Sequence, residues 1–354
     1  MGNHTKYAAL AEKISGEIRI GKYAVGERLP SENDLAASSA LSRQTVRQAL
    51  SLLEQQGLID RKQGSGSRVR AVSSPRPCQG RSHNIAVITT YIGEYIFPDI
   101  LRGIEKVLMA HQYSPLISAT RNRVDNERRI LLDCLSRPID GLIVEGTKTA
   151  LPNPNLDLYQ KLSSRNIPTV FVHGFYPDLS CPVFVASDDR KGGQQAAELL
   201  IKKGHTRIGG IFKSDDIQGH RRYAGYTQAL RDAGLELADD RVLWYTTENR
   251  SSLLSSYALT ILADCTAVVC YNDEVALQII GILRTAHRRI PQDIALVSFD
   301  NSHYCSLSPV PITSFSCQKR QIGILAAQKL LHLIEGTPQQ STVLPWKLIE
   351  RASC

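Results

Sequence analysis

From residue 84 onward, short apolar segments alternate with amphipathic ones, and this alternation constrains the possible fold more than any other feature of the chain. The apolar segments have the length of strands buried on both faces, whereas the intervening ones, such as 98–111 and 192–203, repeat apolar residues at helical spacing. Repeated strand–helix–strand units imply parallel sheets with right-handed crossovers. We therefore predict an α/β fold with two doubly wound parallel-sheet subdomains and a cleft between them. The predicted strands are Asn84–Thr90, Ser114–Ala119, Gly141–Glu145, Thr169–His173, Arg207–Phe212, Ala267–Tyr271 and Ile294–Phe299.

A change of composition at residues 72–83 (VSSPRPCQGRSH) separates this region from a smaller one before it. Two prolines disfavour a helix there and the small polar residues form no core, so we predict a linker. Residues 1–83 carry a net charge of +6, from 13 Lys and Arg against 7 Asp and Glu, whereas the remaining chain carries only +2. A basic unit on a near-neutral body is typical of polyanion binding, although a basic face can also be simply solvated. The expected regions are 1–71, the linker 72–83, and 84–354.

The N-terminal region has the pattern of three helices and a hairpin. Apolar spacing predicts a helix over 6–20, and a second helix begins after Ser31, where Asp34 occupies the capping-box position. A third helix runs from Ser42 to its stop at Gly57. The segment LIDRKQGSGSRVRAV then has the pattern of two short strands around a flexible tip. This order predicts a winged helix-turn-helix.

The third helix is the one expected to enter the major groove of DNA. Its exposed first turn concentrates hydrogen-bond donors, and Arg can bind guanine bidentately while Gln can bind adenine. The wing tip, with Gln63 and Gly64, is expected to approach the minor groove or phosphates. Alternatively, these polar residues form the solvated side of a small bundle. The candidate residues in the helix are Ser42, Arg43, Gln44, Thr45 and Arg47.

The segments GERLPSENDLA, SRQTVRQALSLLEQQGLI and RKQGSGSRV resemble the GntR family of winged-helix regulators in motif, order and spacing. The resemblance covers the region before the linker and implies double-stranded operator DNA as a partner. Whether the acidic residue of the first segment, Glu32, touches DNA or orients an arginine stays open. The positions that the resemblance implies are Arg28, Ser31 and Glu32 near phosphates, Arg43, Thr45 and Arg47 in the recognition helix, and Gln63 and Gly64 in the wing.

Candidates for a small-molecule site follow the predicted strands of the C-terminal region. Ligands of open α/β sheets bind outside the carboxyl ends of the strands. Polar and aromatic residues there suit a sugar, because carboxylates and amides hydrogen-bond hydroxyls and an aromatic face covers C–H groups. Such residues can instead be helix caps, the better interpretation for Asp273, and the tyrosines can lie at the edge of the core. The candidates are Tyr91, Glu94, Tyr95, Glu145, His173, Asn272 and Asp300, with Arg222 opening a helix that begins near His220.

The segments VASDDRKGGQQAAELLIKKGHTRIGGI, HRRYAGYTQALRDAGL, VVCYNDEVAL and IALVSFDNS resemble the periplasmic-binding-protein-like domain of LacI/GalR repressors. This resemblance implies that His173, Arg222, Asn272 and Asp300 contact the ligand, and that Asp188 is either a further contact or a helix cap. The opening TTYIGEYIFPDILRGIE is similar to that of the arabinose repressors of Gram-positive bacteria, which implies a small sugar such as L-arabinose as effector. Another pentose, a hexose or a purine is the alternative.

Both resemblances together predict a transcription repressor that senses a sugar. Two winged helices would meet two half-sites of a palindromic operator, so we expect a homodimer. The sugar would close the cleft, and the linker would transmit a shift that disfavours DNA binding. The opposite sense, with the ligand as corepressor, is an alternative.

Other classes of protein have less support in the sequence. A GxSxG motif, a Walker lysine and an identifiable Schiff-base lysine, as in aminotransferase-fused GntR relatives, are absent, so we expect no enzyme and no cofactor. The eight cysteines form no CxxC pair and no His cluster has metal-ligand spacing, which predicts reduced thiols and no metal. A transport binding protein would need a signal peptide, but Glu12 and Glu17 interrupt the N-terminus, and no long apolar run suggests a membrane. We expect a cytoplasmic protein whose C-terminal LPWKLIERASC adds an edge strand.

Overall fold

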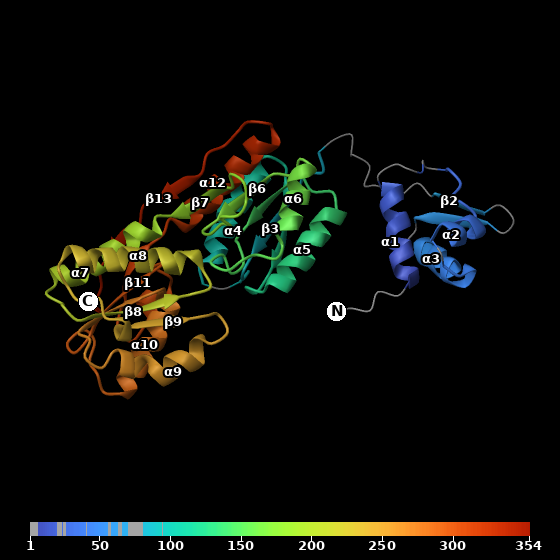
Figure 1. Ribbon diagram of the computed structural model, residues 1–354. Coiled ribbons are helices and arrows are strands. Elements are labelled where there is room, and N and C mark those ends of the chain that lie inside the picture. Colours follow the sequence, from blue (N-terminus) through green and yellow to red (C-terminus); the bar gives the residue numbers. More distant parts are fainter. Residues whose placement is uncertain are drawn as a thin grey trace. The chain divides into compact units, whose positions relative to one another are not determined.

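The chain divides into two compact units, Met1–Gly80 and Arg81–Cys354. In Figure 1 the first unit is blue and the second runs from cyan to red. Each unit encloses its own buried apolar side chains. This computed structural model describes the chain apart from residues 1–5, 20–22, 24–25, 40, 56–57, 63–65, 70–80 and 94.

The described part of the N-terminal unit consists of three helices followed by a hairpin, as predicted. Its elements are α1 (Lys6–Arg19), α2 (Glu32–Ser39), α3 (Arg43–Gln55), β1 (Ile59–Lys62) and β2 (Gly66–Val69). The core lies where Leu10 and Ile14 of α1 meet Val46 and Leu50 of α3. The two strands pair antiparallel, and a further antiparallel bridge joins Arg28 to β2. The unit is therefore a winged helix-turn-helix, and the tip of its wing lies outside the described residues.

The capping box predicted at α2 is confirmed. The backbone amide of Asp34 donates to Ser31 Oγ over 3.3 Å, and the amide of Ser31 donates to Asp34 Oδ2 over 3.1 Å. The Asp34 carboxylate accepts a further hydrogen bond from the Ser31 hydroxyl over 2.6 Å, and this bond, followed by the one from the Ser31 amide, lowers the pKa of the Asp34 carboxyl. At α3 the amide of Thr45 donates to Ser42 Oγ over 3.2 Å. Local hydrogen bonds thus satisfy backbone donors at the start of both helices of the helix-turn-helix.

The described part of the C-terminal unit contains two six-stranded sheets, each covered by helices, which we call the first and second lobes. The first lobe has β3 (Asn84–Thr89), β4 (Ser114–Ala119), β5 (Gly141–Val144), β6 (Thr169–Val172), β7 (Val183–Ser187) and β13 (Thr342–Leu344). The second has β8 (Ile208–Lys213), β9 (Val242–Tyr245), β10 (Ala267–Cys270), β11 (Ala295–Phe299), β12 (Thr313–Ser316) and β14 (Lys347–Ile349).

The strand orders are β13-β7-β6-β5-β3-β4 in the first lobe and β14-β12-β11-β10-β8-β9 in the second. Neighbours run parallel except for the edge strand β14, which is antiparallel to β12. The predicted fold class, doubly wound parallel sheets behind a winged helix-turn-helix, is confirmed. The predicted C-terminal edge strand is β14.

The helices sort into the same two lobes, and the chain passes between the lobes after β7, after β12 and between β13 and β14. Figure 1 shows the late elements α12 and β13 beside the early strands of the first lobe. Three connections in this pattern form a hinge about which two lobes can close. First-lobe helices are α4 (Phe97–Ala110), α5 (Val124–Ser136), α6 (Leu156–Ser164) and α12 (Lys319–Ile334). Second-lobe helices are α7 (Asp189–Lys202), α8 (Ile217–Asp232), η1 (Asp239–Arg241), α9 (Arg250–Ile261), α10 (Asp273–Thr285) and α11 (Tyr304–Leu307).

All seven predicted strands of this unit are present, whereas β7, β9, β12 and β13 were not predicted. These four are only three to five residues long, and β12 has the sequence TSFS. Its Ser314 is buried because its hydroxyl donates to the Asp273 carboxylate, a tertiary contact that no local pattern reveals. Within the described residues, no helix combines the length and apolar character needed to cross a bilayer.

Candidate functional sites

The N-terminal end of α3 presents exposed hydrogen-bond donors. Arg43, Gln44 and Arg47 are exposed and Thr45 is half-buried, whereas Val46 of the same helix is fully buried. One face of α3 therefore belongs to the core and the opposite face is free to enter a groove. Two guanidinium groups and one amide on that face are the donors that direct base recognition uses.

The two serines predicted at this interface shape the helix ends. Ser31 and Ser42 each accept from a backbone amide through Oγ, as described above, and both remain exposed. Because the start of a helix collects backbone N–H groups and positive potential, these ends are suited to phosphate oxygens.

Glu32 at the start of α2 orients an arginine of the recognition helix. Its Oε2 accepts from Arg47 Nη2 over 3.1 Å and from Nε over 3.3 Å. The Arg47 side chain is 66% exposed and that of Glu32 29%. The ion pair joins α2 to α3. The sequence left open whether Glu32 touches DNA or orients an arginine, and this geometry supports the role of orienting Arg47.

Arg28 lies beside the wing. Its Nε is only 2.6 Å from the position that a Cβ on Gly66 would occupy, and Gly66 has φ +77°. A glycine is therefore required at the start of β2 for the guanidinium to lie against the strand. Arg28 is exposed. It precedes α2 in the chain and pairs with Arg68 of the wing strand β2. Gln63 and Gly64 lie outside the described residues.

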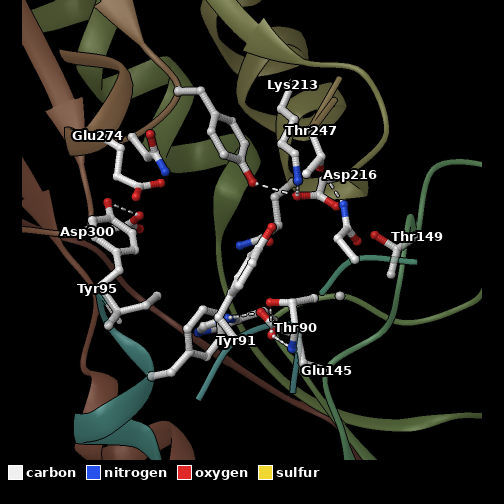
Figure 2. A pocket seen from close by; sticks show the side chains of 18 of the residues that line it. Thr90, Tyr91, Tyr95, Glu145, Thr149, Lys213, Asp216, Thr247, Glu274 and Asp300 are labelled. Atoms are coloured by element: carbon white, nitrogen blue, oxygen red, sulfur yellow. Dashed lines mark hydrogen bonds and ion pairs between the residues drawn. The ribbon is translucent and has the colours of Figure 1, made fainter. Parts of the chain in front are cut away.

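The second candidate site is a cavity of about 250 Å³ between the two lobes, shown in Figure 2. Its walls come from the loops after β3, β4, β5 and β6 in one lobe and from the ends of β8, β9, β10 and β11 in the other. The carboxyl ends of the strands thus surround it, as expected for open α/β sheets. Seven of the predicted residues line this cavity: Tyr91, Tyr95, Glu145, His173, Arg222, Asn272 and Asp300.

Arg222 is a buried cation in the cavity wall, 1% exposed. Its Nε donates to Asp189 Oδ1 over 2.9 Å, its Nη1 donates to the carbonyl oxygen of Tyr271, and its Nη2 lies 3.7 Å from Asp300 Oδ1. The guanidinium also lies over the rings of Tyr271, Phe299 and Trp346. Burial alone would lower the pKa of Arg222, but the two carboxylates outweigh it and raise that pKa. The site therefore holds a fixed, permanently charged donor.

Close packing of α7 on α8 brings these charges together. A Cβ on Gly193 would lie 1.9 Å from the carbonyl oxygen of Arg222, and one on Gly225 would lie 1.8 Å from that of Arg190. Any side chain at either position would push the helices apart. Arg222 lies in the second turn of α8, because the helix begins at Ile217 rather than near His220 as predicted.

Tyr95 reaches from the first lobe to the second. Its hydroxyl donates to Asp300 Oδ2 over 2.6 Å and accepts from the amide of Asp273 over 3.1 Å. Tyr95 and Asp300 have φ of +60° and +91°, a conformation that non-glycine residues seldom adopt and that clusters at functional sites. Burial, reinforced by the Asp300 charge, raises the pKa of Tyr95, so the phenol stays protonated.

The sequence left open whether strand-end residues such as Asn272 and Asp273 contact a ligand or stabilise the following helix. Asn272 lines the cavity and also caps α10, since its Oδ1 accepts from the amide of Val275 over 3.0 Å. Asp273 is fully buried and structural, accepting from Ser298 Oγ, Ser314 Oγ and the amide of Ser302. The preference for a structural Asp273 is confirmed, but its expected role as a helix cap is wrong, because Asn272 caps α10 and Asp273 is the first residue of that helix.

Glu145 and His173 form a buried pair in the first lobe. His173 Nδ1 lies 3.3 Å from Glu145 Oε1, and Thr90 donates to Glu145 Oε2 through its amide at 2.8 Å and its hydroxyl at 2.6 Å. Burial alone would lower the pKa of His173, but the hydrogen bond and charge of Glu145 outweigh it, so the pKa is raised.

Four further charged residues line the cavity that the sequence analysis missed. Lys213 Nζ donates to Asp216 Oδ2 over 2.7 Å, and Arg250 Nη1 donates to Glu274 Oε2 over 2.9 Å. Lys213 and Asp216 follow the predicted strand at 207–212, so the strand-end rule applied there would have found them. Arg250 follows the unpredicted β9, and Glu274 is separated from β10 by Tyr271, Asn272 and Asp273, of which only Asn272 was predicted as a ligand contact.

One predicted effector residue, Asp188, does not line the cavity. Asp188 caps α7, accepting from the amide of Lys191 over 3.0 Å, and is not among the lining residues, so we no longer count it as a ligand candidate. The strand end before it, on β7, instead forms part of the hinge. Glu94 lies outside the described residues. Among the residues that are described, no group of His, Cys, Asp and Glu side chains has the arrangement of a metal site.

Comparisons with known proteins agree with both halves of this architecture. Residues 6–69 match the bacterial regulatory proteins of the gntR family, and residues 197–354 match a periplasmic binding protein-like domain. The chain is 36% identical to the arabinose metabolism transcriptional repressor of Halalkalibacterium halodurans, over 99% of this chain and 96% of that protein. It is 37% identical to the protein of that name from Geobacillus stearothermophilus, over 93% and 91%. The solved transcriptional regulator CelR–cellobiose complex has the same fold, with a TM-score of 0.70 at 22% identity over 92% of this chain and 100% of that chain.

Proposed function

The chain belongs to the family of the arabinose metabolism transcriptional repressors, and on that premise we propose that L-arabinose releases it from the operator of sugar-utilisation genes. It is a DNA-binding transcriptional regulator, not an enzyme, with a GntR-type reader and a periplasmic-binding-protein-like sensor. One observation carries the proposal. Among the residues that the structure describes, each charged side chain lining the sensor cavity has an ion-pair partner, so the cavity offers hydrogen bonds without demanding a charged ligand.

A neutral polyol fits this chemistry. Sugar hydroxyls both donate and accept, so they can donate to the carboxylates of Glu145 and Asp300 and accept from Arg222. The rings of Tyr91 and Tyr271 provide aromatic surface for the C–H face of a sugar. A cavity of about 250 Å³ suits one small ring rather than a polymer.

Release would follow from lobe closure. A ligand that contacts both lobes binds the closed form better than the open one, and only such differential binding can shift the equilibrium. We further propose a cytoplasmic homodimer, in which two recognition helices meet two operator half-sites and closure disfavours their DNA-compatible arrangement. A coupling of about 1–3 kcal/mol between sugar and operator is typical of such switches.

The proposal is tested by titrating L-arabinose into the full-length protein bound to its operator, with calorimetry of the same protein against other pentoses, hexoses and purines. We expect L-arabinose to bind tightest and to weaken operator affinity. Stronger binding of another ligand would replace L-arabinose as effector, tightened operator binding would make the sugar a corepressor, and unchanged operator affinity with sugar demonstrably bound would contradict the mechanism. Analytical ultracentrifugation with a half-site and a full-site duplex tests the homodimer.

A further inference from the structure

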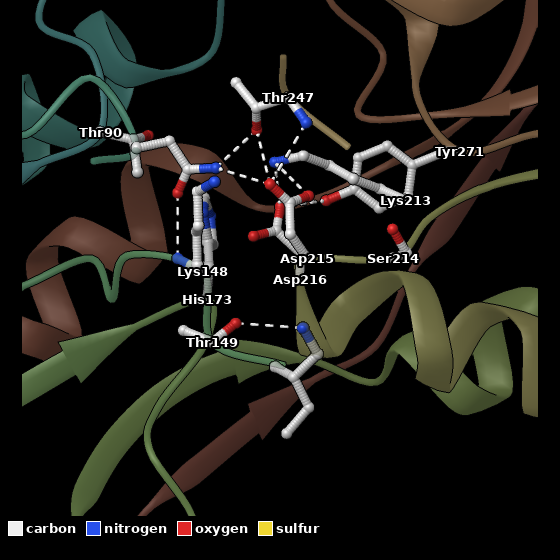
Figure 3. Close-up of polar contacts among 12 residues, drawn as sticks. Thr90, Lys148, Thr149, His173, Lys213, Ser214, Asp215, Asp216, Thr247 and Tyr271 are labelled. Carbon is white, nitrogen blue, oxygen red and sulfur yellow. Dashed lines mark hydrogen bonds and ion pairs between the residues drawn. The ribbon is translucent and has the colours of Figure 1, made fainter. Parts of the chain in front are cut away.

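A set of polar contacts joins the two lobes at one side of the cavity (Figure 3), and three of its residues, Asn122, Thr149 and Thr247, also line the cavity. On the first lobe it consists of Asn122 and the segment 147–150, and on the second lobe of Asp215, Ile217, Thr247 and Glu248. We call this set the cleft latch. Its contacts exist in the chain by itself, so their free energy belongs to lobe closure and not to a ligand.

Asn122 is the central residue of the cleft latch. It is 1% exposed, and its Oδ1 accepts from the amide of Lys148 over 3.0 Å within the first lobe. Its Nδ2 donates across the cleft to Thr247 Oγ1 over 2.6 Å and to Asp215 Oδ2 over 3.3 Å. Arg121 and Asn122 have φ of +53° and +54°, which turns the loop after β4 sharply, and Asn tolerates this conformation better than most residues.

The buried Asp215 carboxylate makes the loss of its hydrogen bond from Asn122 costly in free energy. The residue is fully buried, and its Oδ2 also accepts from the amide and hydroxyl of Thr247 over 3.2 Å and 2.9 Å. Its Oδ1 accepts no hydrogen bond from the described residues and lies 3.6 Å from Lys213 Nζ. A buried carboxylate with few partners is sensitive to the loss of any donor. The donor from the first lobe is present only while the lobes are together.

The segment 147–150 adds three more contacts across the cleft. The amide of Ala150 donates to the Asp215 carbonyl oxygen over 3.3 Å, and the amide of Ile217 donates to Thr149 Oγ1 over 3.0 Å. Lys148 forms an ion pair with Glu248. Lys148, Asp215 and Glu248 are not among the residues that line the cavity, so these side chains act on closure from outside it.

The segment is itself anchored in the first lobe. The amide of Thr147 donates to the Tyr176 hydroxyl oxygen over 2.6 Å, and that hydroxyl donates to the buried Glu127 carboxylate over 2.5 Å. Glu127 also accepts from Tyr159, Asn153 and Asn155. A segment held this firmly transmits cross-cleft contacts to its whole lobe instead of yielding locally.

We propose that the cleft latch sets the open–closed equilibrium of the sensor, and that its residues are positioning residues that tune effector and operator affinity together. The two affinity consequences rest on the proposed function. A ligand that binds only the closed form has an apparent Kd equal to its intrinsic Kd divided by the closed fraction. Weakening the cleft latch therefore raises the Kd of every sugar by the same factor. It also strengthens operator binding by the sugar-free protein, because the open form is the one that holds DNA.

The experiment compares full-length wild type with Asn122→Asp, which replaces the cross-cleft donor by a second carboxylate, and with Lys148→Met, which leaves the cavity lining intact. Lys161→Met is the matched control, since its ion pair with Asp157 lies within α6. Hydrogen exchange of peptides containing Ala150 and Ile217, without sugar, should be about tenfold faster in Asn122→Asp, less so in Lys148→Met, and unchanged in the control. Calorimetry of Lys148→Met should show equal fold-changes for each sugar that binds, because Lys148 does not line the cavity.

Two results would overturn the inference. One is wild-type exchange at Ala150 and Ile217 in a folded Asn122→Asp protein, or in Lys148→Met if the first variant does not fold. The other is a Kd change in Lys148→Met that differs from sugar to sugar, which would mean a ligand contact instead of a closure effect. Because the exchange measurement needs neither sugar nor operator, a wild type that binds no sugar would refute the proposed function while leaving the cleft latch to be judged by exchange alone.

Discussion

The two units of this protein use arginine in opposite ways. Arg47 on the recognition helix is 66% exposed and paired with one carboxylate, so its donors can meet a polyanion from outside. Arg222 in the sensor is 1% exposed and enclosed by two carboxylates and three aromatic rings. The first arrangement suits a charged partner that binds through exposed, salt-screened contacts, whereas the second fixes a charge in a buried cavity wall, where it suits a small neutral ligand.

This contrast predicts a large difference in salt dependence. Operator affinity should fall about 10³- to 10⁵-fold between 50 and 200 mM salt, if the protein contacts roughly 6–10 phosphates. Sugar affinity should change less than about twofold over that range, because the cavity charges are paired and screened little by added ions. Fluorescence anisotropy with operator and calorimetry with sugar in the same buffers measure both slopes. Comparable slopes would break the contrast.

Removing the buried cation should affect stability more than removing an exposed one. Arg222→Met leaves Asp189 and Asp300 buried without their partner, so we expect a loss of about 3–5 kcal/mol in the free energy of unfolding of the C-terminal unit. Arg128→Met, which breaks a surface pair with Asp157, should lose less than about 1 kcal/mol. Urea denaturation followed by circular dichroism compares them. Equal losses would show that the Arg222 cluster is not tightly coupled.

Substitution of Arg47 in the N-terminal unit should change the specificity of DNA binding and leave sugar binding unchanged. Arg47→Ala should reduce discrimination between operator and mutated operator by about 1–3 kcal/mol, since it removes an exposed side chain that we propose contacts bases. Its sugar affinity should match wild type. Glu32→Gln sharpens the test, because freeing Arg47 from its carboxylate should raise affinity for unrelated duplexes. If Arg47→Ala also abolished sugar binding, the assignment of separate roles to the two units would be wrong.

The units should also differ in their response to pH, with the smallest effect. The raised pKa of His173 adds stability to the C-terminal unit that is complete below its ordinary value of about 6.5 and is lost as pH rises through the raised value. The lowered pKa of Asp34 adds stability to the N-terminal unit that is lost only as pH falls through the lowered value. As pH rises from 6 to 8, the free energy of unfolding of the C-terminal unit should therefore fall in wild type, and it should fall less in His173→Gln. An identical slope in both proteins would exclude this role of His173.

What the sequence predicts well is local or periodic. The alternation of strands and helices predicted the doubly wound fold, and the Ser31–Asp34 spacing predicted a cap that forms as expected. Residues directly after strongly apolar strands, such as Glu145 and Asp300, were found because strand ends meet at one edge of a sheet. Residues that depend on tertiary contacts escaped. Asn122 matters through bonds to residues 93 and 125 positions away, and no spacing rule reports those.

The account requires that sugar binding by the C-terminal unit and operator binding by the N-terminal unit are energetically coupled. Measuring this linkage in both directions tests it most directly. L-arabinose affinity should be measured by calorimetry for the full-length protein alone and saturated with operator, and operator affinity with and without the sugar. Thermodynamics requires the two ratios to agree, and we predict that each partner weakens the other by the same factor, about 5- to 150-fold. Sugar affinity that is identical in the presence and absence of operator would contradict the account.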